Sequence, residues 1–377
     1  MTTIGILGAG QLGRMLGQAA LPLGVTCRFL DPAADPPAAA VGRCITAAFD
    51  DALAQQAFAA GCQALTWEFE NVSLAAVETL SALVPMRPGA QALAAKQDRL
   101  DEKRFFNDLG IATAPFAPVS SREELADAVA SIGLPAVLKT RRDGYDGKGQ
   151  MVLREPADLD RAWATLGAKP LILEGFIPFL RECSLLAVRG LDGEIRCWSL
   201  VENEHRHGIL HRSLAPAPHA WVLQAQAETA ARAVLERLDY VGVLAIEFFQ
   251  HEDRLLANEF APRVHNSGHW TIEGAVTSQF SNHIRAVAGL PLGVTAMRGH
   301  AAMINVIGAW PILADLLAIP GTQVHDYGKA PRPGRKLGHV TVVHEDASRL
   351  ADLIAAIEAL VVAAAPERAL PRVASGQ

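Results

Sequence analysis

Two glutamates in neighbouring apolar runs are the first residues in this sequence that could bind a metal ion. Glu247 lies in the run 245–249 and Glu259 in the run 257–260, and a short polar turn between the runs predicts a hairpin. A turn centred on residues 252 and 253 places the two carboxylates opposite each other, with Cβ atoms about 5 Å apart. Because like charges repel there, we expect a cation between them, and Mg²⁺ that holds substrate phosphates suits carboxylate ligands. The alternative is a pair of edge glutamates facing solvent.

A lysine and a glycine-rich loop could bind phosphate. Lys139 ends the apolar run 134–138, where a lysine is costly unless it meets an anion. The segment 144–150 reads Gly-Tyr-Asp-Gly-Lys-Gly-Gln, and its glycines let backbone N–H groups approach phosphate. Glu174 ends an apolar strand and Glu182 begins another, so these carboxylates could bind adenine and ribose hydroxyls. An exposed hairpin turn and solvated strand ends are the alternatives.

A second glycine-rich loop lies near the N-terminus. Gly8, Gly10 and Gly13 follow an expected strand at 3–7, and Asp31 ends the next strand. This arrangement meets the literal dinucleotide fingerprint, which predicts NAD binding. The alternative is a Rossmann-like domain whose loop faces another ligand or only packs.

Basic residues gather near the C-terminus. Arg332, Arg335 and Lys336 form the densest basic cluster outside Arg141 and Arg142, in a chain that is acidic overall. Guanidinium groups suit phosphate oxygens, so the cluster is a candidate phosphate site. The alternative is a solvated basic turn.

Two groups of histidines could do chemistry. His205, His207 and His211 have spacing that a transition metal could use, but no cysteine or carboxylate completes a tetrahedral set, which disfavours zinc. His265 and His269 lie in a segment whose proline, serine and glycine predict a loop. They are candidates for proton handling or substrate contact, and structural hydrogen bonding is the alternative.

Three segments must position these residues. Residues 1–98 alternate strands and helices, which predicts a Rossmann-like domain with a parallel sheet. Residues 99–299 mix helices with locally paired strands, which predicts an α+β domain. Residues 300–377 should form a small C-terminal domain with one alanine-rich helix at 348–365. In the second segment strands are expected at 136–140, 150–153, 171–173, 183–188, 194–200, 242–250 and 254–260, and helices at 122–131, 157–166, 220–237 and 279–288.

Composition limits the function classes. The 377 residues include 34 Lys+Arg and 40 Asp+Glu, and the net charge of −6 argues against binding to nucleic acid or to a membrane surface. No run reaches the ~18 uninterrupted apolar residues of a membrane span, and no signal peptide is visible. Five scattered cysteines without a Cys-x-x-Cys pair fit reduced thiols. We therefore expect a cytoplasmic protein of several domains.

Motifs along nearly the whole chain resemble the 5-(carboxyamino)imidazole ribonucleotide synthase family of the ATP-grasp superfamily. Lys139, the glycine loop, Glu174, Glu182, Glu247 and Glu259 occur in the ATP-grasp order. The most specific motif is Asn-Glu-Phe-Ala-Pro-Arg-Val-His-Asn-Ser-Gly-His-Trp-Thr at 258–271. The others are Ile-Leu-Gly-Ala-Gly-Gln-Leu-Gly-Arg-Met-Leu at 6–16, Thr-Trp-Glu-Phe-Glu-Asn-Val at 66–72, Gln-Asp-Arg at 97–99 and Arg-Pro-Gly-Arg-Lys-Leu-Gly-His at 332–339.

The resemblance implies a specific role for each of these residues. It implies a central ATP-grasp domain with a mobile lid at about 115–175, and a C-terminal domain that closes the substrate site. Mg²⁺ would be held by Glu247 and Glu259, and Lys148, Arg263 and His269 would be catalytic. ATP would contact Arg99, Lys139, Gly144, Tyr145, Asp146, Gly147, Lys148, Gly149, Gln150, Glu174, Gly175, Phe176, Ile177, Glu182, His205, Asn258 and Glu259. The ribonucleotide would contact Gln11, Leu12, Glu68, Tyr145, Asp146, Asn266, Lys329, Arg335 and Lys336.

The implied activity is the ATP-dependent carboxylation of 5-aminoimidazole ribonucleotide by bicarbonate, through carboxyphosphate, in a homodimer. The nearest alternative is the formate-dependent glycinamide ribonucleotide transformylase of the same superfamily. An NAD-dependent dehydrogenase rests on the first glycine loop and Asp31 alone. A non-catalytic nucleotide-binding module is disfavoured because the metal glutamates and the phosphate lysine are present.

Overall fold

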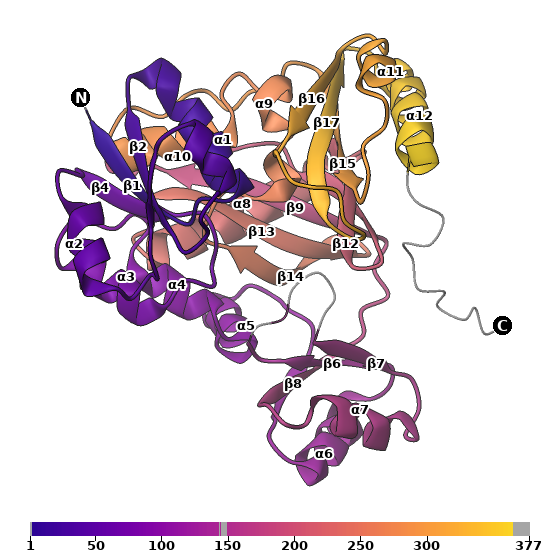
Figure 1. Ribbon diagram of the computed structural model, residues 1–377. Helices are drawn as coiled ribbons and strands as arrows, with labels where there is room; N and C mark the ends of the chain where they lie inside the picture. Colours follow the sequence, from indigo (N-terminus) through magenta and orange to yellow (C-terminus); the bar gives the residue numbers. More distant parts are fainter. Residues whose placement is uncertain (1, 143, 145–148, 365–377) are drawn as a thin grey trace.

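Three sheets organise the protein in the computed structural model, which describes residues 2–142, 144 and 149–364 (Figure 1). The first sheet has the strand order β3-β2-β1-β4 and all of its pairs are parallel. This confirms the parallel sheet expected for the N-terminal segment. Its elements are β1 (Thr3–Leu7), α1 (Gln11–Ala20), η1 (Leu21–Leu23), β2 (Thr26–Asp31), η2 (Pro37–Ala40), β3 (Arg43–Thr46), α2 (Ala52–Ala59) and β4 (Ala64–Trp67).

Three helices connect this sheet to the remainder of the chain: α3 (Leu74–Ser81), α4 (Ala90–Lys96) and α5 (Arg99–Asp108). Asp98 caps α5 by accepting a hydrogen bond from the backbone N–H of Leu100. The same carboxylate forms an ion pair with Arg141 at 2.8 Å. The start of α5, including Arg99, is therefore tied to the strand that carries Lys139.

The second sheet is antiparallel, has the order β5-β8-β6-β7, and has α6 and α7 packed against it. Figure 1 shows this unit set off from the rest of the molecule. Its core is separate from those of the other sheets, so few apolar contacts hold it in place. Its elements are β5 (Phe116–Val119), α6 (Arg122–Ile132), β6 (Ala136–Thr140), β7 (Gln150–Leu153), α7 (Asp158–Leu166) and β8 (Leu171–Gly175).

The third sheet has nine strands in the order β14-β13-β9-β11-β12-β15-β17-β16, with β10 paired to β9. Residues on β9 alternate between two cores, with Leu185 and Ala187 in one and Leu186 and Val188 in the other. Helices α8 and α10 cover the two faces, which explains why these strands read as continuous apolar runs. The elements between the second sheet and this sheet's C-terminal strands are β9 (Arg181–Arg189), β10 (Ile195–Cys197), β11 (Val201–Arg206), β12 (Ile209–Ala215), α8 (Trp221–Arg237), β13 (Gly242–His251), β14 (Arg254–Ala261), η3 (Asn266–Gly268), α9 (Thr271–Gly274) and α10 (Gln279–Ala288).

The last strands of the chain extend this same sheet. Strand β15 pairs with β12, so Ala302 lies opposite Leu214 and the hydrogen-bonded ladder continues into the C-terminal segment. Helix α12 packs against β15 and β17, and α11 lies beside β16 (Figure 1). The elements are β15 (His300–Ile307), α11 (Leu313–Leu317), β16 (Thr322–Asp326), β17 (Lys336–His344) and α12 (Ala347–Ala364).

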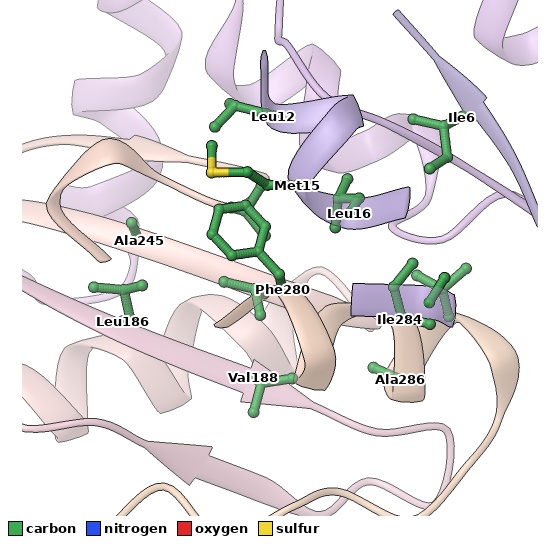
Figure 2. Close-up of a cluster of buried hydrophobic side chains, with 14 of the residues drawn as sticks. Ile6, Leu12, Met15, Leu16, Leu186, Val188, Ala245, Phe280, Ile284 and Ala286 are labelled. Atoms are coloured by element: carbon green, nitrogen blue, oxygen red, sulfur yellow. The ribbon is translucent and has the colours of Figure 1, made fainter. Parts of the chain in front are cut away.

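Helix α1 connects the first sheet to the third. Its apolar face packs on α10 and on strands β9 and β13, and Figure 2 shows Leu12, Met15 and Leu16 beside Phe280 and Ile284. All five side chains are at most 8% exposed. This shared core fixes the residues at the start of α1 relative to the nine-stranded sheet.

His283 on α10 joins the same two sheets by hydrogen bonds. Its Nε2 lies 3.0 Å from the Thr66 hydroxyl, and its Nδ1 accepts from the backbone N–H of Val243 at 3.1 Å. Burial lowers the pKa of His283 from its usual 6.5 to about 4. Because the unfolded chain then binds more protons between pH 4 and 6.5, the free energy of unfolding falls as pH drops through that window.

We expect this histidine alone to remove about 3 kcal/mol of stability between pH 6.5 and pH 4. Urea unfolding of the wild type and of His283→Asn at several pH values measures the effect. The variant should have a shallower decline of stability with falling pH. If the stability of the two proteins fell equally with falling pH, His283 would not be the source of the pH dependence.

Candidate active site

A cleft of about 600 Å³ collects residues from the second and third sheets, from the start of α1 and from the segment that follows β4. Its lining combines cations, carboxylates and a few aromatic side chains, as expected for a site that binds phosphates beside an apolar ring. Residues that line it include Gln11, Leu12, Lys96, Arg99, Lys103, Lys139, Gly144, Gln150, Glu174, Gly175, Phe176, Ile177, Glu182, His205, Glu247, Asn258, Glu259, Arg263, Asn266, His269 and Lys336. Many of the residues singled out in the sequence therefore share one cavity.

The predicted hairpin of the two glutamates is confirmed. Strands β13 and β14 pair antiparallel with Glu247 directly opposite Glu259, and an irregularity in register follows Glu247. Burial and the neighbouring carboxylate of Glu259 raise the pKa of Glu247 to about 7. The protein itself supplies a cation beside the pair, because the ammonium group of Lys96 lies 2.6 Å from Glu259 Oε2. His265 Nε2 lies 3.2 Å from Glu247 Oε1.

Lys139 meets the anion that its position in a strand predicts. Its ammonium lies 3.1 Å from Glu174 Oε2, and Lys103 approaches the same oxygen at 3.2 Å. Burial raises the pKa of Glu174, but the two lysines outweigh it and lower the pKa to about 2. Glu174 Oε1 is buried without a hydrogen-bond partner among the residues described. The Glu174 side chain thus orients two lysines at the cleft.

Arg99 holds the base of the glycine-rich loop. It donates hydrogen bonds to the carbonyl oxygens of Thr140 and Gly144, both at 3.1 Å. The backbone of Thr140 also donates to Gly149 O at 2.8 Å. Four candidate loop residues lie outside the described part of the chain: Tyr145, Asp146, Gly147 and Lys148.

Glu182 and His205 form a pair on adjacent strands. His205 Nδ1 lies 2.6 Å from Glu182 Oε2. Burial lowers the pKa of His205, but Glu182 outweighs it, so the pKa is raised above its usual value. Nearby, Phe179 and Phe249 stack with ring centroids 4.8 Å apart. Carboxylate, imidazole and apolar rings together are suited to a nucleoside.

The N-terminal glycine loop surrounds a carboxylate of the protein itself. The backbone N–H groups of Gly10 and Gly13 donate to the carboxylate of Glu68, and a Cβ on Gly10 would lie 2.7 Å from Glu68 Oε1. Asp31 accepts from the backbone N–H of Ala9 at 2.8 Å. The donors that would hold a dinucleotide pyrophosphate are used internally, which removes the basis of the NAD hypothesis.

The structure brings the C-terminal basic residues to the start of α1. Lys329 Nζ donates to Gln11 Oε1, and nearby positive charge from Arg335 and Lys336 acts on Lys329. Burial, aided by these cations, lowers the pKa of Lys329. Three cations near one helix N-terminus are suited to binding an anion.

The long motif that begins in β14 supplies a buried polar cluster. Arg263 Nη2 lies 2.8 Å from Glu70 Oε1, and Nε contacts the other oxygen, which makes a bidentate pair. Asn266 Nδ2 donates to Asn305 Oδ1 at 3.1 Å, and Asn305 Nδ2 donates to Asn266 Oδ1 at 2.8 Å. His269 is 1% exposed, and burial holds its pKa well below the usual value, so its imidazole is neutral.

Sequence reasoning missed several residues of the cleft: Glu70, Lys96, Glu102 and Lys103. In the sequence Glu102 and Lys103 belong to a charged helix that looks solvated. Lys103 is 2% exposed and donates to Asn258 O at 2.7 Å, so it supports the residue beside Glu259. The spacing of Arg99 and Lys103, four residues apart on one helical face, is the signal that could have found it.

The histidine metal site is not formed. Within the described ranges no three His, Cys, Asp or Glu side chains converge as metal ligands. His205 pairs with Glu182, whereas His211 pairs with Glu358 at 3.1 Å.

No helix in the part of the chain that the structure describes is both long and apolar enough to cross a bilayer. The described cysteines are free thiols.

Comparison with known proteins identifies the family. Residues 1–97 match the ribonucleotide synthetase preATP-grasp domain, residues 104–280 match the ATP-grasp domain, and residues 301–352 match the phosphoribosylaminoimidazole carboxylase C-terminal domain. The N5-carboxyaminoimidazole ribonucleotide synthase of Pseudomonas aeruginosa is 54% identical over 360 residues, which cover 96% of this chain and 99% of that protein. The Brucella melitensis enzyme of that name is 47% identical, over 90% of this chain and 96% of its own.

Solved structures agree with these relatives. The crystal structure of N5-carboxyaminoimidazole ribonucleotide synthetase from Thermus thermophilus superposes with a TM-score of 0.92 at 53% identity, covering 95% of this chain and 98% of that one. The Aspergillus clavatus synthase in complex with ADP and 5-aminoimidazole ribonucleotide superposes with a TM-score of 0.89 at 30% identity, covering 96% and 99%. These names favour neither the formate-dependent enzyme nor a dehydrogenase. The chain belongs to the N5-carboxyaminoimidazole ribonucleotide synthase family, whose members are ATP-dependent ATP-grasp ligases that carboxylate 5-aminoimidazole ribonucleotide with bicarbonate in purine biosynthesis.

Proposed function

We propose that the 600 Å³ cleft is where this chain performs its family's reaction, with ATP at the central sheets and the ribonucleotide between α1 and the C-terminal basic residues. The observation that carries the proposal is the convergence in one cleft of phosphate-binding cations, the paired glutamates and the start of α1. Arg99 and Lys139 would bind ATP phosphates. Residues 174–177 would contact adenine, and Glu182 with His205 would contact the ribose.

The glutamate pair is suited to Mg²⁺. Glu247 and Glu259 lie opposite each other, both line the cleft, and Asn258 stands beside them. Hard carboxylate oxygens are the ligands that Mg²⁺ prefers, and the ion usually completes its shell with water and substrate phosphates. When bound there, Mg²⁺ would neutralise charge on the phosphates of ATP.

The ribonucleotide site would lie at the start of α1. Gln11, Leu12, Glu68 and Asn266 would contact the ribonucleotide. Gln11, Leu12 and Asn266 line the cleft, whereas Glu68 does not and lies beneath the glycine loop with 6% exposure. The loop residues Tyr145 and Asp146 are proposed to contact the same substrate. Its phosphate would be bound by Lys329, Arg335 and Lys336, because Lys329 contacts Gln11 and the charges of Arg335 and Lys336 act on Lys329.

The proposed chemistry has two steps. A bicarbonate oxygen attacks the γ-phosphorus, the bond to ADP breaks, and carboxyphosphate forms. In one route the exocyclic amine attacks the carboxyl carbon and phosphate leaves. In the other, carboxyphosphate first breaks down to CO₂ and phosphate, and the amine attacks CO₂. In both routes the amine nitrogen gives up a proton, which the released phosphate can accept. Arg263 would stabilise phosphate charge near Glu259, and Lys148 would do so from the loop.

His269 would orient groups in the second step. Gln279 Nε2 donates to His269 Nδ1 at 3.1 Å, because Gln279 Oε1 already accepts from the backbone of His265. The neutral imidazole therefore carries its proton on Nε2, and that atom can donate a hydrogen bond. We propose that it does so to substrate in the cleft.

The unit at about 115–175 would act as a lid. Carboxyphosphate is fragile in water, so closure of the glycine-rich loop over the site would serve the reaction.

We propose the domain boundaries 1–98, 99–299 and 300–377, a homodimer, and a cytoplasmic location. Gel filtration with light scattering tests the dimer.

Measuring ADP formation tests the reaction. We expect it to require both 5-aminoimidazole ribonucleotide and bicarbonate, with no turnover on glycinamide ribonucleotide and formate. NADH titration monitored by fluorescence should show no binding. Turnover with the formate pair instead would refute the proposal.

Arg335 should determine affinity for the ribonucleotide phosphate. A charged hydrogen bond contributes about 1.5–3 kcal/mol, so Arg335→Ala should raise KM for 5-aminoimidazole ribonucleotide by about 10- to 100-fold. The KM for ATP should stay within about twofold. Arg332→Ala, at an exposed position of the same turn, is the matched control. Equal effects of the two substitutions would exclude a specific role for Arg335.

A further inference from the structure

Lys96 forms an ion pair with Glu259, one of the two glutamates proposed to bind the metal ion. It is the last residue of α4, and its Nζ lies 2.6 Å from Glu259 Oε2. The Lys96 side chain is 9% exposed, whereas that of Glu259 is 38% exposed and faces the cleft. This is a charge-assisted contact at short range in a largely buried place, unlike the loose ion pairs of a protein surface.

Glu102 holds Lys96 in that position. Lys96 Nζ donates to both Glu102 oxygens, at 3.1 and 3.3 Å. Glu102 Oε1 also accepts from the backbone N–H of Phe260 at 2.7 Å, and Phe260 directly follows Glu259. The Glu102 side chain is 1% exposed. The ammonium is therefore fixed between two carboxylates that are both anchored to β14.

The glutamate pair by itself offers few ligands. Within the described ranges no third His, Cys, Asp or Glu joins Glu247 and Glu259 to form a metal site. Mg²⁺ requires six oxygen ligands in near-ideal octahedral geometry. A free divalent ion would have to displace the Lys96 ammonium and rely on two carboxylates and water. An ion that arrives with ATP brings phosphate oxygens as well.

We propose that Lys96 is a positioning residue that neutralises Glu259 in the nucleotide-free protein and so makes divalent-ion binding depend on nucleotide. This inference rests on the proposed metal site at Glu247 and Glu259. A like charge within a few ångströms in a partly buried site strongly opposes the binding of a second cation. Nucleotide phosphates supply the negative charge that offsets the ammonium, and they supply the missing ligands.

Direct measurement of Mn²⁺ binding tests the inference. Mn²⁺ serves as a paramagnetic substitute for Mg²⁺, and the free ion is followed by electron paramagnetic resonance with and without ADP. The wild type should bind Mn²⁺ weakly alone and tightly with ADP. Without nucleotide, Lys96→Met should bind Mn²⁺ about tenfold or more tightly than the wild type does. The ratio of the Mn²⁺ affinity with ADP to that without ADP should therefore be smaller in the variant. Lys96→Arg should retain the wild-type ratio.

Controls separate the possible outcomes. Arg237→Met removes one positive charge at an exposed position at the end of α8 and should leave both affinities unchanged. Circular dichroism checks that Lys96→Met folds, and Lys96→Gln repeats the test with a polar side chain. Unchanged or weaker nucleotide-free Mn²⁺ binding in these variants would overturn the role of Lys96. Absence of Mn²⁺ binding in the wild type with ADP would instead refute the metal site.

Discussion

Replacing Glu259 by glutamine should lower the rate of ADP formation by about 100- to 1000-fold, because the loss of several kcal/mol of charge stabilisation has that effect on a phosphoryl transfer. The amide is close in shape to the carboxylate but lacks the charge that attracts a divalent cation. The fold should persist, since Lys96 keeps its second carboxylate partner in Glu102. Measurements of ADP release and of the melting temperature report the two effects separately.

The hairpin offers a matched control. Asp253 lies at the exposed turn between β13 and β14, so Asp253→Asn removes the same charge from the same hairpin. This variant should turn over at the wild-type rate. Normal turnover in Glu259→Gln would refute the metal assignment, whereas a lowered melting temperature in both variants would indicate damage to the hairpin.

Replacing Arg263 by methionine should destabilise the protein by about 1–3 kcal/mol, because it leaves the partly buried carboxylate of Glu70 without its bidentate partner. Burial alone would raise the pKa of Glu70, but Arg263 outweighs it and lowers the pKa to about 2. The pair is bidentate, and its side chains are 15% and 24% exposed. Urea unfolding measures the loss of stability.

The double variant Arg263→Met with Glu70→Gln distinguishes a structural role from a catalytic one. Removing both charges should restore much of the lost stability, since neither partner is then left as an unpaired buried ion. ADP formation should remain low in both variants if Arg263 acts on the reacting phosphate. Recovery of activity together with stability would show that Arg263 only supports the fold.

Local patterns predicted much of the fold. The alternation of strands and helices predicted the parallel sheet, and the polar turn at 252–253 predicted the pairing of Glu247 with Glu259. The β11–β12 hairpin was missed because its strands alternate polar and apolar residues weakly around His207 and Gly208, the two left-handed turn residues. Pairing between β12 and β15 joins residues far apart in the chain, so no local signal predicts it.

The sequence predicted the cleft residues that belong to recognisable motifs. It did not predict those that reach the cleft only through tertiary packing. Arg99, Lys139, Glu182 and Asn266 reach the cleft as the resemblance implies. Lys96 was missed because a charged residue at a helix end usually faces water. Its burial arises from the packing of α4 on α5 and of α5 against β14, tertiary contacts that sequence periodicity does not report.

The nine-stranded sheet has a consequence for how members of this family can recombine. Because β15 adds to β12, the loop that carries Lys329 and Arg335 joins β16 to β17, two strands of the same sheet that carries Glu247 and Glu259. A chimera with its junction at residue 300 would have to match the partner's strand along four residue pairs, from Arg212 to Ala215. The unit from β5 to β8 makes no such ladder with the rest of the described chain, so it is the part that evolution or an engineer can exchange as a module.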